Sequence, residues 1–149
     1  FEVPAALGAQ VGRPNDIVWS VCGDGGFQMT MCDIATAVES GADVKFAILN
    51  NTSLGMVHQL QDVFFEKEYM SSEFSANPDF VKVAEAYGIR GIRVTKKTEV
   101  VDAVQQAMET AGPVIVDFMV KEDEIVFPFI PSGQSVKEML EEPVPENHV

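Results

Sequence analysis

Long apolar runs are missing from this sequence. None approaches the roughly 20 consecutive apolar residues that a membrane-spanning helix needs, so we expect neither a membrane span nor a membrane partner. Basic residues are also scarce, with 10 Lys and Arg against 23 Asp and Glu and a net charge of −13. This charge repels nucleic-acid backbones and anionic lipid surfaces, which excludes nucleic acid as an expected partner.

Cysteine is nearly absent as well. Cys22 and Cys32 stand ten positions apart, which fits neither a zinc site nor a disulfide framework. We interpret both as buried thiols of a protein in the reducing cytoplasm. The sequence starts at Phe1, and no charged segment precedes an apolar stretch there, so we expect a fragment of a longer chain without a signal peptide.

Apolar runs and helical spacings alternate along the first 120 residues, in a chain that is 46% apolar and long enough for one core. The runs predict strands at 17–22, 44–49, 91–95 and 113–120, of which the first two have the composition of strands covered on both faces. The spacings predict helices at 4–11, 27–40, 54–65, 79–87 and 98–110, the last with Thr98 as a candidate cap.

Alternating strands and helices predict an α/β fold, a doubly wound parallel sheet flanked by helices. We place this domain at residues 1–120. The remainder, 121–149, holds four of the eight prolines and is expected to be an irregular C-terminal arm and tail with little structure. In such sheets ligands bind at the carboxyl ends of the strands, so we expect the binding site in the loops that follow the predicted strands.

The first of these loops is rich in glycine and opens directly into a helix. Gly23, Asp24, Gly25 and Gly26 follow the strand, and backbone N–H groups in such a turn can approach an anion. A dinucleotide fingerprint fails here, because its third glycine position is Gln28. Asp24 would also repel a diphosphate unless Mg²⁺ lay between them, since this ion binds protein oxygens and phosphates together.

A second ligand for such an ion is expected at the end of the neighbouring strand. Asn50 and Asn51 end the predicted strand 44–49, and Asn51 follows Asp24 by 27 positions. A strand, helix and strand in one crossover bring the two strand ends together, so Asp24 and Asn51 can share one ion. Either loop alone is equally well explained as an ordinary turn.

Five segments give the chain its resemblance to a known family, which extends from about Pro4 to about Leu140. GDG followed at this spacing by NN is the diphosphate-binding motif of thiamine-diphosphate enzymes. The segments VCGDGGFQMTMCDIATAV and VKFAILNNTSLGMVHQLQ are similar to those of acetolactate synthase (acetohydroxyacid synthase) catalytic subunits. The likeness continues through NPDFVKVAEAYGIRGIRV, GPVIVDFMV and IVFPFIPSG. It implies the C-terminal, thiamine-diphosphate-binding domain of such a subunit.

The resemblance implies roles for individual residues. Asp24 and Asn51 match side-chain ligands of Mg²⁺, and Ser53 matches the position that supplies a backbone carbonyl. The other cofactor-binding positions match glycines and one methionine beside the diphosphate: Gly25, Gly26, Gly55 and Met56. The last two belong to the segment that closes over the phosphates and faces the substrate.

No residue of the chain is assigned a catalytic role by the resemblance, although three lie on the substrate side. Met56 follows the family pattern, and His58 is interpreted as solvent-facing or as a substrate gate rather than as a catalytic acid or base. Leu60 stands where the family usually has tryptophan, a residue that shapes the preference for 2-ketobutyrate as second substrate. The identity of the second 2-keto acid is therefore open.

The resemblance also implies groups that this chain lacks. The glutamate that activates the cofactor belongs to a pyrimidine-binding domain, usually of another subunit, and FAD binds a further domain of the full-length family. We therefore expect a homo-oligomer acting on pyruvate and a second 2-keto acid in branched-chain amino-acid biosynthesis, and an inactive fragment that binds no FAD. Whether a regulatory subunit attaches is open.

Two alternatives stand beside this interpretation. One is another thiamine-diphosphate carboligase or decarboxylase, such as a glyoxylate carboligase or a sulfoacetaldehyde acetyltransferase. The other is a non-catalytic module that keeps the fold.

Overall fold

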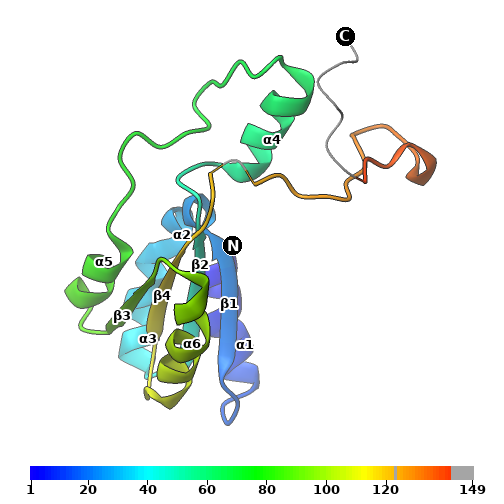
Figure 1. Ribbon diagram of the computed structural model, residues 1–149. Coiled ribbons are helices and arrows are strands. Elements are labelled where there is room, and N and C mark those ends of the chain that lie inside the picture. The colour runs from blue at the N-terminus through cyan, green and yellow to red at the C-terminus, as the bar shows by residue number, and fades with distance from the viewer. Residues whose placement is uncertain (123, 142–149) are drawn as a thin grey trace.

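The computed structural model describes residues 1–122 and 124–141; residues 123 and 142–149 of the predicted arm and tail lie outside the described part. At its centre is a sheet of parallel strands in the order β1-β2-β4-β3 (Figure 1). The strands are β1 (Val18–Gly23), β2 (Val44–Asn50), β3 (Arg90–Val94) and β4 (Val114–Met119). The α/β fold with a parallel sheet and flanking helices is therefore confirmed.

Helices cover both faces of the sheet, as a doubly wound fold requires. One face packs against α1 (Glu2–Gly12), α2 (Asp24–Thr30), α3 (Ile34–Ser40) and α5 (Phe80–Ala86). The other face packs against α6 (Val100–Glu109) (Figure 1). In contrast, α4 (Gly55–Phe64) lies beyond the carboxyl ends of the strands, away from both layers.

The larger core lies under α1, α2, α3 and α5. Phe27 of α2 is fully buried there and makes edge-to-face contacts with Phe46, at 5.9 Å between ring centroids, and with Phe80, at 5.5 Å. Full burial of each such side chain stabilises the fold by about 1.5–3 kcal/mol. These three rings join α2, β2 and α5. The core therefore fixes the positions at which α2 and α5 begin, near the ends of the strands.

The predicted helix 27–40 differs from the observed one in two respects. It begins earlier, at Asp24, so the glycine-rich turn is the first turn of α2 rather than a loop before it. It is also interrupted by a 3-10 helix, Met31–Asp33, because the backbone of Thr30 leaves the helical region with φ −134°. The new direction lets Ile34 and Ala37 of α3 reach the core.

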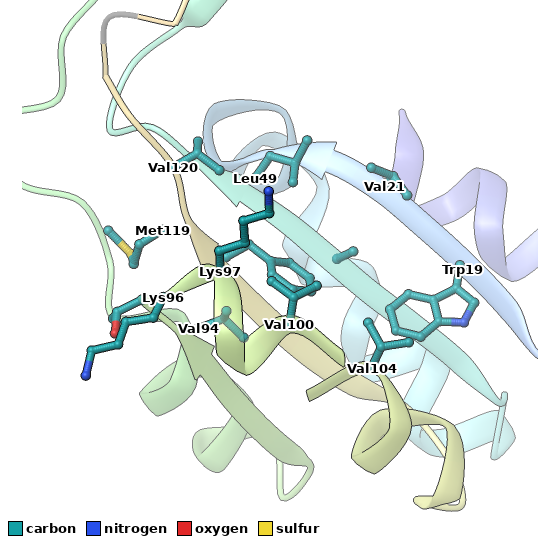
Figure 2. A pocket seen from close by; sticks show the side chains of 13 residues that line it. Trp19, Val21, Leu49, Val94, Lys96, Lys97, Val100, Val104, Met119 and Val120 are labelled. Carbon is teal, nitrogen blue, oxygen red and sulfur yellow. The ribbon is translucent and has the colours of Figure 1, made fainter. Parts of the chain in front are cut away.

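The prediction that both early strands are covered on each face is wrong for β1. Val21 is 62% exposed and Leu49 of β2 is 44% exposed, because α6 covers the β3 and β4 side of its sheet face and leaves the β1 side open. An apolar cavity of about 570 Å³ lies on this open face beside α6 (Figure 2). Trp19 and Val104 border it at one end.

Two smaller predictions also need correction. Thr98 does not begin the last helix, because a 3-10 turn, Lys97–Glu99, precedes α6 and the Glu99 carboxylate accepts the backbone N–H groups of Thr95 (3.0 Å) and Lys96 (3.1 Å). Burial raises the pKa of the Cys22 thiol to about 12, as a buried thiol requires. Cys32, however, is exposed, because it lies in the 3-10 helix that links α2 and α3.

The arm after β4 contains a little regular structure. A 3-10 helix, Val136–Glu138, forms within it, and Phe129 pairs with Leu140 through two backbone hydrogen bonds of 3.0 and 2.9 Å. The separation into domains at residue 120 stays a prediction. Among the described residues, no helix combines the length and apolar character needed to span a membrane.

Candidate functional site

The register of β1 and β2 brings the two predicted loops together. Gly23 at the end of β1 lies beside Leu49 of β2, so Asp24 and Asn51 leave the sheet at neighbouring positions. Because both strands are parallel, their carboxyl ends meet at one edge. The predicted proximity of Asp24 and Asn51 is thus a direct result of strand pairing.

Asp24 occupies the first turn of α2 and is fully buried. Burial raises the pKa of its carboxyl group, and a hydrogen bond from Asn77 to its Oδ2 atom, of 2.7 Å, opposes that rise. A buried carboxylate is stable only where donors or a cation compensate its charge. The other oxygen, Oδ1, faces Asn51.

Three polar groups converge at this point. One terminal atom of the Asn51 amide lies 3.1 Å from Asp24 Oδ1 and 3.0 Å from the Ser53 carbonyl oxygen. If it is the nitrogen, it donates to both oxygens; if it is the oxygen, it lies at the spacing of a neighbouring ligand from each of them. In an octahedral Mg²⁺ site with bonds near 2.1 Å, neighbouring ligand oxygens are about 3.0 Å apart. The donor set and spacing therefore fit this ion.

Clusters of ionisable metal ligands are missing from the described residues. These residues contain no cluster of three or more His, Cys, Asp and Glu side chains that could hold a metal. The groups that lie beside Asp24 are the Asn51 amide and the Ser53 carbonyl, and oxygen ligands of this kind suit Mg²⁺ rather than Zn²⁺.

The Ser53 carbonyl is held in place by a short antiparallel pairing. Leu54 donates its N–H to Ser72 at 2.7 Å, and Phe74 donates to Thr52 at 2.8 Å, on either side of Ser53. Thr52 adopts a φ of +56°, which is rare for a β-branched residue. Backbone strain of this kind persists only where neighbouring contacts fix it, and it is common at functional sites.

Two glycines allow these segments to approach closely. A Cβ atom on Gly25 would lie 2.7 Å from Leu54 Cδ2 and 3.1 Å from Phe74 Cζ. A Cβ atom on Gly55 would lie 3.0 Å from Asn51 Nδ2. Gly26 is less constrained, with Glu2 Oε2 at 3.4 Å. Gly25 and Gly26 follow Asp24 in the first turn of α2 and Gly55 lies against Asn51; the contacts of all three with a diphosphate stay predictions.

The three substrate-side candidates lie on α4. Met56 and Leu60 are 59% and 41% exposed, and their proposed role stays a prediction. His58 is not solvent-facing, because its side chain is only 14% exposed. It stacks on Tyr69 with ring centroids 4.2 Å apart, and its Nε2 atom lies 3.4 Å from Glu73 Oε1.

A polar cavity of about 270 Å³ lies between His58 and the loop that carries Asn51 and Ser53. His58 of α4 lines this cavity together with Asn51, Ser53 and Glu122. The start of α4 and the loop after β2, which carries the candidate metal ligands, therefore border the same cavity. Thr52 Oγ1 donates to Glu122 at 2.8 Å and thereby ties the segment after β4 to the wall of the cavity. Loops from β2 and β4 thus build one site.

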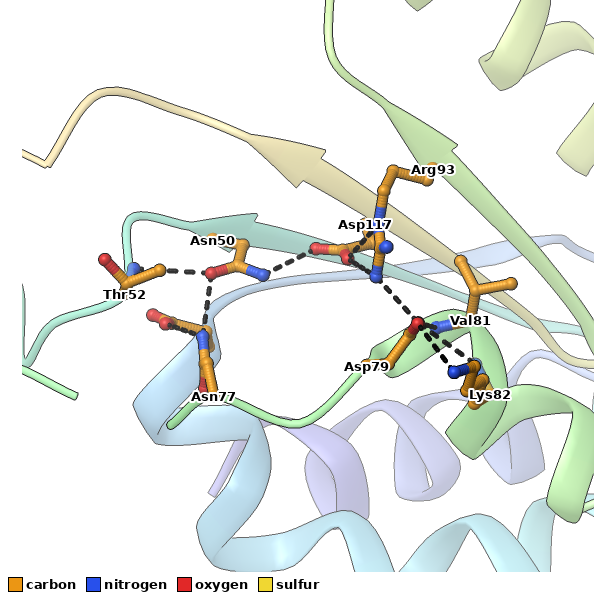
Figure 3. A network of polar contacts seen from close by, with 9 residues as sticks. Asn50, Thr52, Asn77, Asp79, Val81, Lys82, Arg93 and Asp117 are labelled. Atoms are coloured by element: carbon orange, nitrogen blue, oxygen red, sulfur yellow. Dashed lines mark hydrogen bonds and ion pairs between the residues drawn. The ribbon is translucent and has the colours of Figure 1, made fainter. Parts of the chain in front are cut away.

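Sequence reasoning missed a network of polar residues behind this site (Figure 3). It links five side chains: Asn50, Asn77, Asp79, Arg93 and Asp117. Asp117 could have been found, because a lone aspartate in the apolar run VIVDFMV must have a buried partner. The role of Asn77 depends on long-range contacts that no local pattern reveals.

Comparison with known proteins agrees with this geometry. The family described as "Thiamine pyrophosphate enzyme, C-terminal TPP binding domain" matches residues 1–118. The chain belongs to this family. The resemblance to a thiamine-diphosphate-binding domain, first suggested by GDG and NN, is therefore confirmed.

Individual relatives are acetolactate synthases. The chain is 40% identical over 141 residues to the acetolactate synthase isozyme 2 large subunit of Escherichia coli, covering 95% of this chain and 26% of the relative. It is 44% identical over 140 residues to the large subunit of Corynebacterium glutamicum (91% and 22%). The mitochondrial enzyme of Schizosaccharomyces pombe is 41% identical over 140 residues (94% and 21%). The chain thus spans about a quarter of the length of these relatives.

Proposed function

We propose that this domain binds Mg²⁺ through Asp24, Asn51 and the Ser53 carbonyl, and that the ion holds the diphosphate of thiamine diphosphate. The observation that carries the proposal is the position of one terminal atom of the Asn51 amide, 3.1 Å from Asp24 Oδ1 and 3.0 Å from the Ser53 carbonyl oxygen. A chain with a net charge of −13 needs a cation to attract a diphosphate, which supports a metal between Asp24 and the phosphates.

We further propose that the whole protein is a carboligase of the acetolactate synthase type, which condenses pyruvate with a second 2-keto acid in branched-chain amino-acid biosynthesis. When bound, thiamine diphosphate supplies the chemistry by which a 2-keto acid loses CO₂ and joins a second one. The residues of this chain bind and orient the diphosphate end. His58 borders the same cavity and is suited to gate it.

The remaining partners are expectations from the resemblance to acetolactate synthase catalytic subunits. We expect a homo-oligomer in the cytoplasm, in which the pyrimidine-binding domain of another subunit completes the site. FAD is expected on a domain outside this chain. The 149 residues by themselves are expected to form no acetolactate, and acetolactate formation by the purified fragment would contradict this.

Calorimetry on the intact protein tests the metal site. Mg²⁺ is titrated at saturating thiamine diphosphate into the native protein and into Asp24→Asn, which removes one charge at the proposed ligand. We expect the variant to lose Mg²⁺ affinity by at least about a hundredfold, the effect of losing a charged ligand. Asp102→Asn is the matched control, because it removes the same charge from an exposed position on α6. Equal affinities of both variants would contradict the proposal.

Product analysis separates the alternatives. The intact enzyme is given pyruvate alone, pyruvate with 2-ketobutyrate, glyoxylate, or sulfoacetaldehyde with phosphate. We expect acetolactate from pyruvate alone; a product formed only from glyoxylate or sulfoacetaldehyde would identify another carboligase of this family. Thiamine diphosphate binding without any product would favour a non-catalytic module.

A further inference from the structure

The polar network behind the site crosses the sheet in its spatial order. It starts at Arg93 on β3, passes to Asp117 on β4, then to Asn50 on β2 and to Asn77 (Figure 3). Asn77 connects it to Asp24, which follows β1. We propose that Asn77 is the positioning residue of the metal site, which holds Asp24 so that a single carboxylate oxygen faces the ion. This inference rests on the proposed Mg²⁺ function.

Asn77 is itself fixed at both ends of its amide. Its Nδ2 atom donates to Asp24 Oδ2 at 2.7 Å and to Asn50 Oδ1 at 2.8 Å, and its Oδ1 atom accepts from Gln28 Nε2 at 2.8 Å. A rotated amide would place oxygen against two oxygens and nitrogen against a donor. The amide therefore has one favourable orientation, with its donor directed at Asp24.

Asn50 provides the anchor for this arrangement. Its Oδ1 atom accepts from Asn77 and from the backbone N–H of Thr52 at 3.3 Å, and its Nδ2 atom donates to Asp117 Oδ1 at 2.9 Å. Asp117 is fully buried, and its second oxygen accepts two hydrogen bonds from Arg93, at 3.1 and 3.0 Å. A buried carboxylate paired with a guanidinium in this way has little freedom to turn.

The consequence concerns how Asp24 can bind a cation. Because Asn77 occupies Oδ2, only Oδ1 faces Asn51 and the Ser53 carbonyl. Binding through one oxygen suits the compact octahedron of Mg²⁺, whereas Ca²⁺ accepts carboxylates that bind through both oxygens. Asn77 is thus expected to favour Mg²⁺ over Ca²⁺ as well as to strengthen binding.

The test compares two metals on the intact protein at saturating thiamine diphosphate. Dissociation constants for Mg²⁺ and for Ca²⁺ are measured by calorimetry in the native protein and in Asn77→Ala. Loss of a residue that orients a metal ligand typically weakens binding about 10–100-fold. We expect at least about tenfold weaker Mg²⁺ binding and a smaller loss for Ca²⁺, because the freed Asp24 can offer both oxygens to the larger ion.

Two further variants keep the test decisive. Gln28→Leu frees the far end of the Asn77 amide without touching Asp24, and we expect a change in the same direction but smaller. If Asn77→Ala does not fold, the Mg²⁺ and Ca²⁺ affinities of Gln28→Leu test the positioning role in its place. Glu85→Gly, at an exposed position of α5, lowers stability without touching the network and should leave the ratio of the two affinities unchanged.

The outcomes separate this inference from the function on which it rests. Unchanged Mg²⁺ affinity in Asn77→Ala, or equal losses for the two metals, overturns the positioning role. If Glu85→Gly shifts the ratio as much as Asn77→Ala does, the effect is one of stability and the role is also overturned. A Mg²⁺ affinity of Asp24→Asn equal to that of Asp102→Asn overturns the metal site itself, independently of Asn77.

Discussion

The sheet with its flanking helices and the outer region formed by α4 and residues 124–141 are stabilised in different ways. In the sheet region, core residues such as Phe27, Phe46 and Phe80 are fully buried. In α4, Gln59 alone is buried, and the apolar side chains of this helix are largely exposed. Their exposed fractions are 59% for Met56, 42% for Val57, 41% for Leu60 and 47% for Phe64.

Specific polar contacts take the place of a core in the outer region. The Gln59 side chain donates to the Val126 carbonyl at 3.1 Å and accepts the Val126 N–H at 2.9 Å, which fixes the arm on α4. Phe64 meets Phe129 edge-to-face with ring centroids 6.4 Å apart. Apolar burial therefore fixes the strand ends, whereas a few pairwise contacts fix the segment that borders them.

The largest expected contrast between the regions comes from two phenylalanines. Phe27→Ala should lower the free energy of unfolding by about 3–5 kcal/mol, because it leaves a cavity in the core. Phe64→Ala, in a similar edge-to-face pair but 47% exposed, should cost less than about 1 kcal/mol. Chemical denaturation of both variants measures the difference. Similar losses would show that the outer region is as tightly packed as the core.

Close packing within the sheet region is tested at Gly91. A Cβ atom there would lie 2.9 Å from Val81 Cα and 3.0 Å from its carbonyl oxygen, so α5 would have to move away from β3. Gly91→Ala should destabilise the protein by about 1–3 kcal/mol in thermal unfolding. Gly8→Ala is the control, because its Cβ would meet nothing within 4 Å in α1, and it should stabilise by up to about 1 kcal/mol.

A third prediction concerns the Gln59 pair. Gln59→Ala removes both hydrogen bonds to Val126, each worth about 1 kcal/mol, so amide exchange at Val126 should accelerate at least about tenfold. Exchange in β2 and β4 should stay as slow as before. Gln105→Ala, which removes an exposed contact with Glu109, should change neither. Unaltered protection of Val126 would mean that other contacts hold the arm.

The smallest expected effects come from two matched glutamates. Backbone N–H groups of Thr95 and Lys96 lower the pKa of Glu99, and the N–H and hydroxyl of Ser135 lower that of Glu138, both from 4.5. A carboxyl group whose pKa is lower in the folded state stabilises the fold fully at pH values above its ordinary pKa. This contribution is lost as pH falls through the pKa of the folded state.

Denaturation below pH 4.5 checks this pair. Glu99→Gln should reduce the loss of global stability as pH falls below 4.5, because Glu99 precedes α6 of the sheet region. Glu138→Gln should leave that loss unchanged, because Glu138 caps a turn of the arm. An equal reduction of this loss in Glu99→Gln and Glu138→Gln would show that the arm unfolds together with the sheet.

Local patterns were sufficient for the order of strands and helices and for the pairing of Asp24 with Asn51. Strand ends follow from apolar runs, and one crossover necessarily brings two of them together. The interruption at Thr30, the exposure of Val21 and the surroundings of His58 were not predictable, because each depends on what packs against the segment. The same holds for Asn77, which reaches Asp24 across 53 positions.

Sequence patterns establish a parallel α/β domain, the residues that end its first two strands, and their resemblance to a diphosphate site. The folded chain is needed to show that the Asn51 amide meets Asp24 Oδ1 and the Ser53 carbonyl, and that Asn77 occupies the other oxygen of Asp24. The reason is physical. Periodicity and turn chemistry act between near neighbours, whereas the orientation of a buried carboxylate is set by donors that the fold brings from distant segments.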